Sequence, residues 1–292
     1  MKKIVILVIC STILWGCEEE IPRDQLIPYT PKLVVNEYFN NEEAFSIEVS
    51  FSADAYKETI PGILGEDKVK VSLTEDNVDI PLVFANGLFT SAIKPQAGKR
   101  YNLTISSPQY GTATASGILP ENITGKTVTY IEDGGIDMQG LESDLLKLTF
   151  KDNAGTKDYY KLNFFYYSEL VEQFNAFDFE LTGILSAVNT VKTREGGFLF
   201  SDELFNGQTT TFTAVPPFGL VKSNLKYKYL VQIQHLSDDF WKYNTSLEQY
   251  RGGLGSGISG NNLFGGAVVV YSNISNGLGI FAGANVESDT IK

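Results

Sequence analysis

The sequence predicts an all-β fold in two parts, with one amphipathic helix in the second part. The chain holds 15 Tyr and 19 Phe against only 2 Met, and aromatic residues favour strands. Apolar and polar residues alternate over short segments, most clearly from Phe45 to Phe51. Asn86-Gly87 separates two such segments and is typical of a two-residue hairpin. With 43% hydrophobic residues, the chain can fill a substantial core.

The first predicted domain covers residues 31–120, after a tether over residues 17–30. Phe45, Ile47, Val49 and Phe51 share one strand face and are expected to point into the core. Turn signals about every 8–12 residues favour an immunoglobulin-like or transthyretin-like sandwich. The predicted strands are Leu33–Phe39, Phe45–Phe51, Val69–Thr74, Leu82–Phe84, Leu88–Thr90, Tyr101–Ile105 and Thr112–Ile118.

The second and larger predicted β domain covers residues 121–292. Asp152 to Gly155 is expected to form a hairpin turn between two of its strands. Phe174 to Leu185 is compatible with a strand, a short helix or a long excursion. The predicted strands are one beginning near Thr127, then Lys147–Lys151, Tyr159–Tyr167, Phe198–Ser201, Thr209–Thr213, Tyr227–Gln234, Ala267–Tyr271 and Leu278–Ala282.

One segment of this domain, residues 237–250, predicts a helix. Ser237 is a suitable N-cap, and acidic residues follow it in the first turn, where they oppose the helix dipole. Gly252-Gly253 is expected to end the helix. Its apolar face is predicted to consist of Phe240, Tyr243, Leu247 and Tyr250.

The N-terminus predicts export and lipidation. Residues 1–16 combine two lysines with the apolar run Ile4–Leu14, which is too short to span a bilayer and is typical of a signal peptide. Leu14-Trp15-Gly16-Cys17 resembles a bacterial lipobox, which implies lipid on the Cys17 sulfur. We therefore expect a lipid-anchored, surface-exposed protein of the outer membrane; a cleaved secretory signal or an uncleaved anchor are the alternatives. The run that follows resembles the surface-export signal of Bacteroidota-type lipoproteins and consists of Glu18, Glu19 and Glu20.

Charge and cysteine content exclude several classes of partner. The formal net charge of −12 becomes about −14 once Lys2 and Lys3 are removed with the signal peptide. Nucleic acids and anionic membrane surfaces attract basic patches, so neither is an expected partner, and membrane contact is expected through the lipid. The mature chain keeps Cys17 alone, which rules out an internal disulfide and a cysteine-based metal site.

No catalytic residue, cofactor or metal is predicted. His235 is the single histidine, it has no Gly-x-Ser-x-Gly partner motif, and a structural role is favoured. Glu132 to Asp137 offers carboxylates without EF-hand spacing, so a solvated turn is preferred to a calcium loop. The neighbouring acids Asp202-Glu203 and Asp238-Asp239 make poor acid/base pairs, because adjacent strand residues point to opposite faces.

Two further features are candidates for partner contact. Gly255 to Gly260 matches a dinucleotide fingerprint but follows a helix, so we interpret it as a loop. Aromatic residues are dense from Tyr159 to Phe179; core packing explains most of them, and some are candidates for an exposed binding role.

Four segments of the second half resemble one family. They are Phe150–Tyr160, Asp202–Gln208, Leu236–Tyr243 and Asn273–Gly283. Their order and spacing resemble Bacteroidota surface lipoproteins described as a domain of unknown function and often encoded beside SusC-like TonB-dependent receptors.

The resemblance implies a non-catalytic accessory lipoprotein that docks on such an importer or captures its ligand, whose identity the sequence does not name. A surface adhesion or assembly module is the alternative, and a hydrolase of surface polymers is disfavoured. Besides the Asn273–Gly283 segment, the predicted partner contact is the loop 252–262, with Gly252, Gly253, Gly255, Gly257, Gly260 and Asn261.

Overall fold

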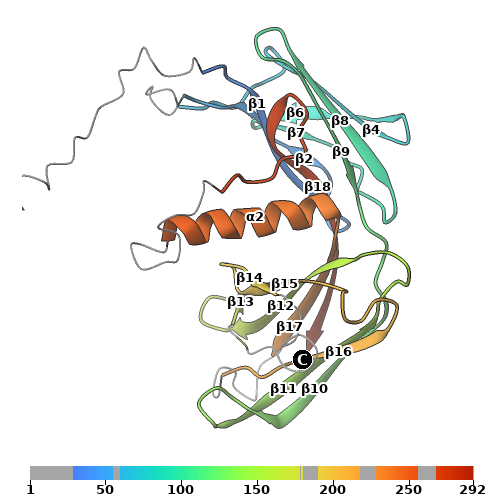
Figure 1. Cartoon of the computed structure of the whole chain (residues 1–292), viewed down its shortest axis with the longest axis vertical. Helices are drawn as coiled ribbons and strands as arrows, with labels where there is room; N and C mark the ends of the chain where they lie inside the picture. Colours follow the sequence, from blue (N-terminus) through green and yellow to red (C-terminus); the bar gives the residue numbers. More distant parts are fainter. Residues whose placement is uncertain are drawn as a thin grey trace, which may run out of the picture.

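A computed structural model describes residues 29–54, 60–177, 179, 190–217, 228–255 and 268–291. Strands dominate these residues, and α2 (Asp238–Gly255) is the single helix among them, which confirms the all-β prediction with one helix. Figure 1 shows an upper group of strands early in the chain, a lower group from its middle, and α2 running between the two groups. No helix in the described part of the chain is both long and apolar enough to cross a membrane.

The upper group contains two small sheets, with strand orders β5-β4-β8-β9 and β2-β7-β6. Both sheets are antiparallel, as short strands joined by tight turns favour. The strands are β1 (Leu33–Asn40), β2 (Ser46–Ile47), β3 (Val49–Phe51), β4 (Lys70–Glu75), β5 (Val78–Ile80), β6 (Val83–Ala85), β7 (Leu88–Thr90), β8 (Arg100–Ser107) and β9 (Gly111–Ile118).

The predicted inward face of residues 45–51 is confirmed. Phe45, Ile47 and Val49 are at most 1% exposed, whereas Glu48 is exposed. Phe51 is half-buried and packs against the same core. The strand breaks at Glu48, because β2 pairs with β7 and β3 pairs with β1.

Asn86-Gly87 joins β6 to β7 as predicted, with Ala85 directly opposite Leu88. Asn86 has φ +54° and Gly87 has φ +85°. Positive φ at both central residues defines a type I′ turn, whose twist matches that of the paired strands.

The lower group forms a three-stranded sheet, β10-β11-β16, and part of an eight-stranded sheet. The larger sheet has the order β14-β15-β12-β17-β18-β1-β3, and β13 also pairs with β12. The strands are β10 (Thr124–Ile136), β11 (Glu142–Lys151), β12 (Tyr159–Ser168), β13 (Gln173–Ala176), β14 (Val191–Lys192), β15 (Gly197–Ser201), β16 (Thr209–Ala214), β17 (Tyr229–Leu236) and β18 (Gly277–Ile291).

The last strand, β18, joins the two groups. Its first half pairs in parallel with β1, and its second half pairs antiparallel with β17. Ala284 lies at the change of partner, opposite both Asn40 and Leu236. One sheet therefore contains strands from both predicted domains, and the predicted boundary at residue 120 falls in the connection from β9 to β10. That boundary stays a prediction.

Two large hydrophobic cores flank β18, and a smaller buried cluster includes its Ala284. The upper core includes Phe281 of β18 and Ile274, which precedes that strand. The lower core is rich in aromatic residues, among them the buried Tyr160, Phe164, Phe177 and Phe179. Core packing thus accounts for these members of the aromatic run.

Helix α2 begins as predicted. The Ser237 hydroxyl accepts a hydrogen bond from the Phe240 amide at 3.3 Å. Tyr38 of β1 packs on Phe240, and Trp241 stacks on Tyr159 of β12 at 4.8 Å. The helix thus contacts strands of both groups.

The predicted end of α2 at Gly252-Gly253 is wrong, since the helix continues to Gly255. Arg194 donates a hydrogen bond to the backbone carbonyl of Arg251 at 3.1 Å, and so supports the last turns of the helix. A glycine costs a helix only about 1 kcal/mol, which such a contact can offset.

One turn prediction and one strand prediction also need correction. Asp152 to Gly155 is not a hairpin turn, because β11 and β12 belong to different sheets and this segment crosses between them. Val268 to Tyr271 is not a strand, and Ala267 lies outside the described residues. The Tyr271 amide and hydroxyl donate to Ser246 and Asp239 of α2, so the helix holds this segment.

Candidate functional site

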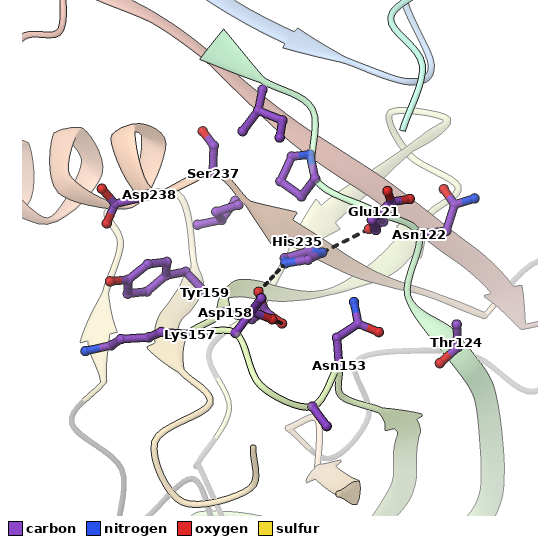
Figure 2. A pocket seen from close by; sticks show the side chains of 15 residues that line it. Glu121, Asn122, Thr124, Asn153, Lys157, Asp158, Tyr159, His235, Ser237 and Asp238 are labelled. Carbon is purple, nitrogen blue, oxygen red and sulfur yellow. Dashed lines mark hydrogen bonds and ion pairs between the residues drawn. The ribbon is translucent and has the colours of Figure 1, made fainter. Parts of the chain in front are cut away.

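A pocket of about 680 Å³ opens where the two strand groups meet (Figure 2). Its walls come from the connection between β9 and β10, the connection between β11 and β12, and the turn from β17 into α2. Its volume falls within the usual range of about 300–1,000 Å³ for small-molecule sites. The polar side chains that surround it include Asn122, Thr124, Asn153, Asp158 and His235.

His235 lies at the base of the pocket and is 5% exposed. Its Nδ1 lies 2.9 Å from the Glu121 carbonyl oxygen, and its Nε2 lies 3.2 Å from Asp158 Oδ1 (Figure 2). Because a carbonyl oxygen can only accept a hydrogen bond, His235 Nδ1 carries the proton in its contact with Glu121. Tyr160 stacks on the ring with centroids 5.2 Å apart. Both ring nitrogens are therefore engaged by the protein, as a structural role requires.

Behind Asp158 lie two further carboxylates, and the fold brings the three together from two segments of the chain, the β11–β12 connection and the end of β15. One oxygen each of Asp152, Asp158 and Asp202 lies within 4.8 Å of the others, and all three side chains are buried. The Tyr160 hydroxyl and the Gly207 amide donate to Asp152 at 2.5 and 2.7 Å. We call these three residues the carboxylate cluster.

The remaining carboxylates of the cluster also accept hydrogen bonds. Thr156 donates to Asp158 at 3.0 Å, and Asn206 donates to Asp202 at 2.8 Å. Burial raises the pKa of Asp202, and the charges of Asp152 and Asp158 add to this rise. Carboxylate oxygens are the ligands that Ca²⁺ takes, so by donor type this is the group of described residues that could hold a divalent cation.

Sequence reasoning missed the carboxylate cluster. It considered Asp202 only beside Glu203, and treated Asp152 as part of a turn. The available signal was that two conspicuous segments, 150–160 and 202–208, each carry a buried aspartate with asparagine nearby. Their proximity depends on β15 pairing with β12 in one sheet while β11 belongs to another sheet, which spacing along the chain does not reveal.

The acidic segment from Glu132 to Asp137 does not form a comparable group. β10 continues through it to Ile136, and its glutamate and first aspartate are exposed. Asp137 is buried and accepts hydrogen bonds from the backbone amides of Gln139 and Leu141. It therefore stabilises the turn between β10 and β11.

The predicted lipidation and export residues lie outside the described residues, namely Cys17, Glu18, Glu19 and Glu20. Of the predicted partner loop, Gly257, Gly260 and Asn261 also lie outside them. The other three members belong to the end of α2, namely Gly252, Gly253 and Gly255.

The Asn273–Gly283 segment has a structural role in the described part of the chain. Asn273 pairs with the backbone of Phe281, donating to its carbonyl at 2.8 Å and accepting from its amide at 2.9 Å. Phe281 is fully buried and belongs to the upper core. Gly279 has φ +99°, and a β-carbon there would meet the Val35 carbonyl oxygen at 1.8 Å. The glycines of this segment therefore permit the close approach of β18 to β1.

Comparison with known proteins identifies the family without assigning an activity. A family model described as Domain of unknown function (DUF4249) matches residues 19–290. No curated protein matches the sequence. Because the family model covers nearly the whole chain, this protein belongs to the DUF4249 family.

Proposed function

We propose that this protein is a non-catalytic surface lipoprotein of the Bacteroidota outer membrane that captures a ligand for a SusC-like TonB-dependent importer. The lipobox ending at Cys17, the acidic run after it and the resemblance to receptor-associated lipoproteins support anchoring and partnership. Docking on the importer without ligand capture is the narrower form of the same proposal.

The pocket at the meeting point of the strand groups is the observation that favours capture. Its size suits a small ligand, and it lies between parts of the molecule, where binding sites are common. Both nitrogens of His235 are engaged, so the one histidine offers no free base beside a nucleophile. Ser237, the nearest hydroxyl in sequence, instead caps α2. These contacts support holding a ligand rather than converting it.

Anchoring is tested with Cys17→Ala in the full-length protein. The variant should leave the membrane fraction, because the stable attachment is lipid on this sulfur. Cys10→Ala is the matched control, since this cysteine lies within the signal peptide, and it should leave the distribution unchanged. An intact mass of the native protein without acyl groups would refute the anchor.

The transport role is tested by co-purification from detergent-solubilised outer membrane. A TonB-dependent receptor should accompany the lipidated protein. Replacement of Glu18, Glu19 and Glu20 by alanine should preserve lipidation but reduce cleavage by protease added to whole cells. A preparation that contains no receptor would place the adhesion or assembly alternative ahead of transport.

A further inference from the structure

The base of the pocket has an excess of negative charge. The carboxylate cluster places three buried acids directly behind it, and His235 is the one basic side chain in the described residues that pairs with them. Lys157 lines the pocket, but it is exposed and lies 4.0 Å from Glu203. Buried charges are poorly screened, so they focus a negative potential into the adjoining cavity.

A second observation concerns an unsatisfied acceptor beside the same wall. Asn285 is fully buried, and its Oδ1 is the one buried side-chain polar atom without a partner in the described part of the chain. Its amide nitrogen donates to the Pro120 carbonyl and to Asn122 Oδ1, both of which belong to pocket-lining residues. Asn285 also lies opposite His235 in the strand register. Asn285 does not itself line the cavity, but the acidic residues Glu121, Asp158 and Asp238 do, against one lysine, Lys157.

We propose that the pocket binds a small organic cation, a molecule carrying an ammonium or guanidinium group such as a lysine- or arginine-containing short peptide. Such groups donate several hydrogen bonds and accept none, so they can pair with the carboxylates that line the pocket. Their positive charge complements the cluster behind Asp158.

The remaining lining suits the rest of such a molecule. Asn153 and Thr124 face the cavity and offer amide and hydroxyl groups to peptide bonds. Ile118, Pro120 and Leu236 offer apolar surface to the methylene groups of a lysine or arginine side chain. The biological use of this binding rests on the proposed capture function, but the binding itself does not.

Calorimetric titration of the soluble mature chain, residues 18–292, tests the ligand class with three probes. They are amidated Gly-Lys-Gly, which is cationic, acetylated Gly-Glu-Gly, which is anionic, and maltose, which is uncharged. Amidated Gly-Lys-Gly alone should bind saturably, and its affinity should fall several-fold between about 50 mM and about 500 mM NaCl. Absence of cationic-peptide binding, or equal binding of either other probe, would overturn the assignment.

Two variants locate the binding. Asn153→Lys introduces a like charge into the cavity and should weaken amidated Gly-Lys-Gly binding at least tenfold. Thr124→Lys, at an exposed position of the same lining, should act in the same direction. Asn102→Lys is the control, because Asn102 lines a separate polar groove on β8 and carries the same charge change. Equal affinity in all three folded variants, checked by melting temperature, would place the site elsewhere.

Two further outcomes distinguish organic-cation binding from an inorganic metal site and from the importer role. If Ca²⁺ binds stoichiometrically and abolishes peptide binding, the cluster holds an inorganic ion and the organic-cation assignment falls. If the peptide binds as expected but no receptor co-purifies, the ligand class stands and the importer role falls.

Discussion

At the scale of single residues, Glu37 is the least expected member of the upper core. Leu33, Val35 and Phe39 occupy alternate positions of β1 and are buried, and Glu37 stands in the same row with 5% exposure. Its Oε1 accepts a hydrogen bond from the Ser46 amide at 3.2 Å. Burial raises the pKa of this carboxyl to about 7. Ionisation of Glu37 therefore opposes folding.

This shift predicts a pH dependence of stability. A carboxyl whose pKa is higher in the folded protein than in the unfolded chain favours folding at low pH, and this advantage is lost as pH rises to about 7. Relative to Glu37→Gln, the wild-type protein should lose up to about 3 kcal/mol of unfolding free energy between about pH 4.5 and pH 7. Urea unfolding at several pH values measures this difference. The exposed Glu48→Gln is the control and should track the wild type. Parallel profiles for Glu37→Gln and the wild type would show that Glu37 titrates normally.

Two neighbouring residues at the break between β2 and β3 predict opposite tolerance to charge. Val49→Asp places an unpaired carboxylate in a fully buried position and should destabilise the protein by several kcal/mol, about 3 or more. Glu48→Lys changes an exposed side chain and should cost less than about 1 kcal/mol. Urea unfolding of both variants compares them. Equal losses would contradict the register of this segment.

At the scale of elements, local patterns predicted where the strands lie better than which strands pair with one another. The alternation from Phe45 to Phe51 and the Asn86-Gly87 turn follow from nearest-neighbour geometry, and both match the structure. The partners of β11 and β12 do not follow from it, because the Asp152 segment resembles a hairpin turn but connects two sheets. The parallel pairing of β1 with β18 spans the whole described chain, so no local pattern could reveal it.

The same distinction applies to the candidate site. His235 falls between the predicted strand Tyr227–Gln234 and the predicted N-cap Ser237, and the structure places it near the end of β17. Its contacts with Glu121 and Asp158 were not predictable, since they join residues 114 positions apart in one case and connect different elements in both. The sequence marks Asn273–Gly283 as one of four family segments, but the role of its glycines in close strand packing follows only from the pairing of β18 with β1.

That role predicts a difference between two glycines with similar backbone angles. Gly279 has φ +99° and would place a β-carbon 1.8 Å from the Val35 carbonyl oxygen, whereas Gly111 has φ +79° and open space around it. Gly111→Ala should cost about 1–2 kcal/mol, from backbone strain alone. Gly279→Ala should cost clearly more, because it also separates β18 from β1. Chemical unfolding of the two variants measures the difference, and similar losses would mean that strain alone explains Gly279.

At the scale of the whole molecule, β18 couples the upper core to the lower one. It contributes Phe281 to the upper core, and its second half pairs with β17, whose Val231 and Ile233 belong to the lower core. The side chain of Asn41 reinforces the junction, since it exchanges two hydrogen bonds with the backbone of Val286, at 2.7 and 2.9 Å. The upper core is therefore complete only when the C-terminal strand is present.

Because the upper core needs β18, we can predict how residues 31–120 behave when they are expressed alone. Without β18, the edge of β1 loses its pairing from Leu33 to Asn40, and the core loses Ile274 and Phe281. The isolated segment should show no cooperative unfolding transition by circular dichroism. A synthetic peptide covering residues 273–287 should restore the transition by adding the missing strand, because main-chain pairing with an open sheet edge supplies affinity. The same peptide with Gly279→Ala should fail, since its β-carbon would meet the Val35 carbonyl. Cooperative unfolding of the segment without any peptide would instead show that the boundary at residue 120 separates independently folding domains.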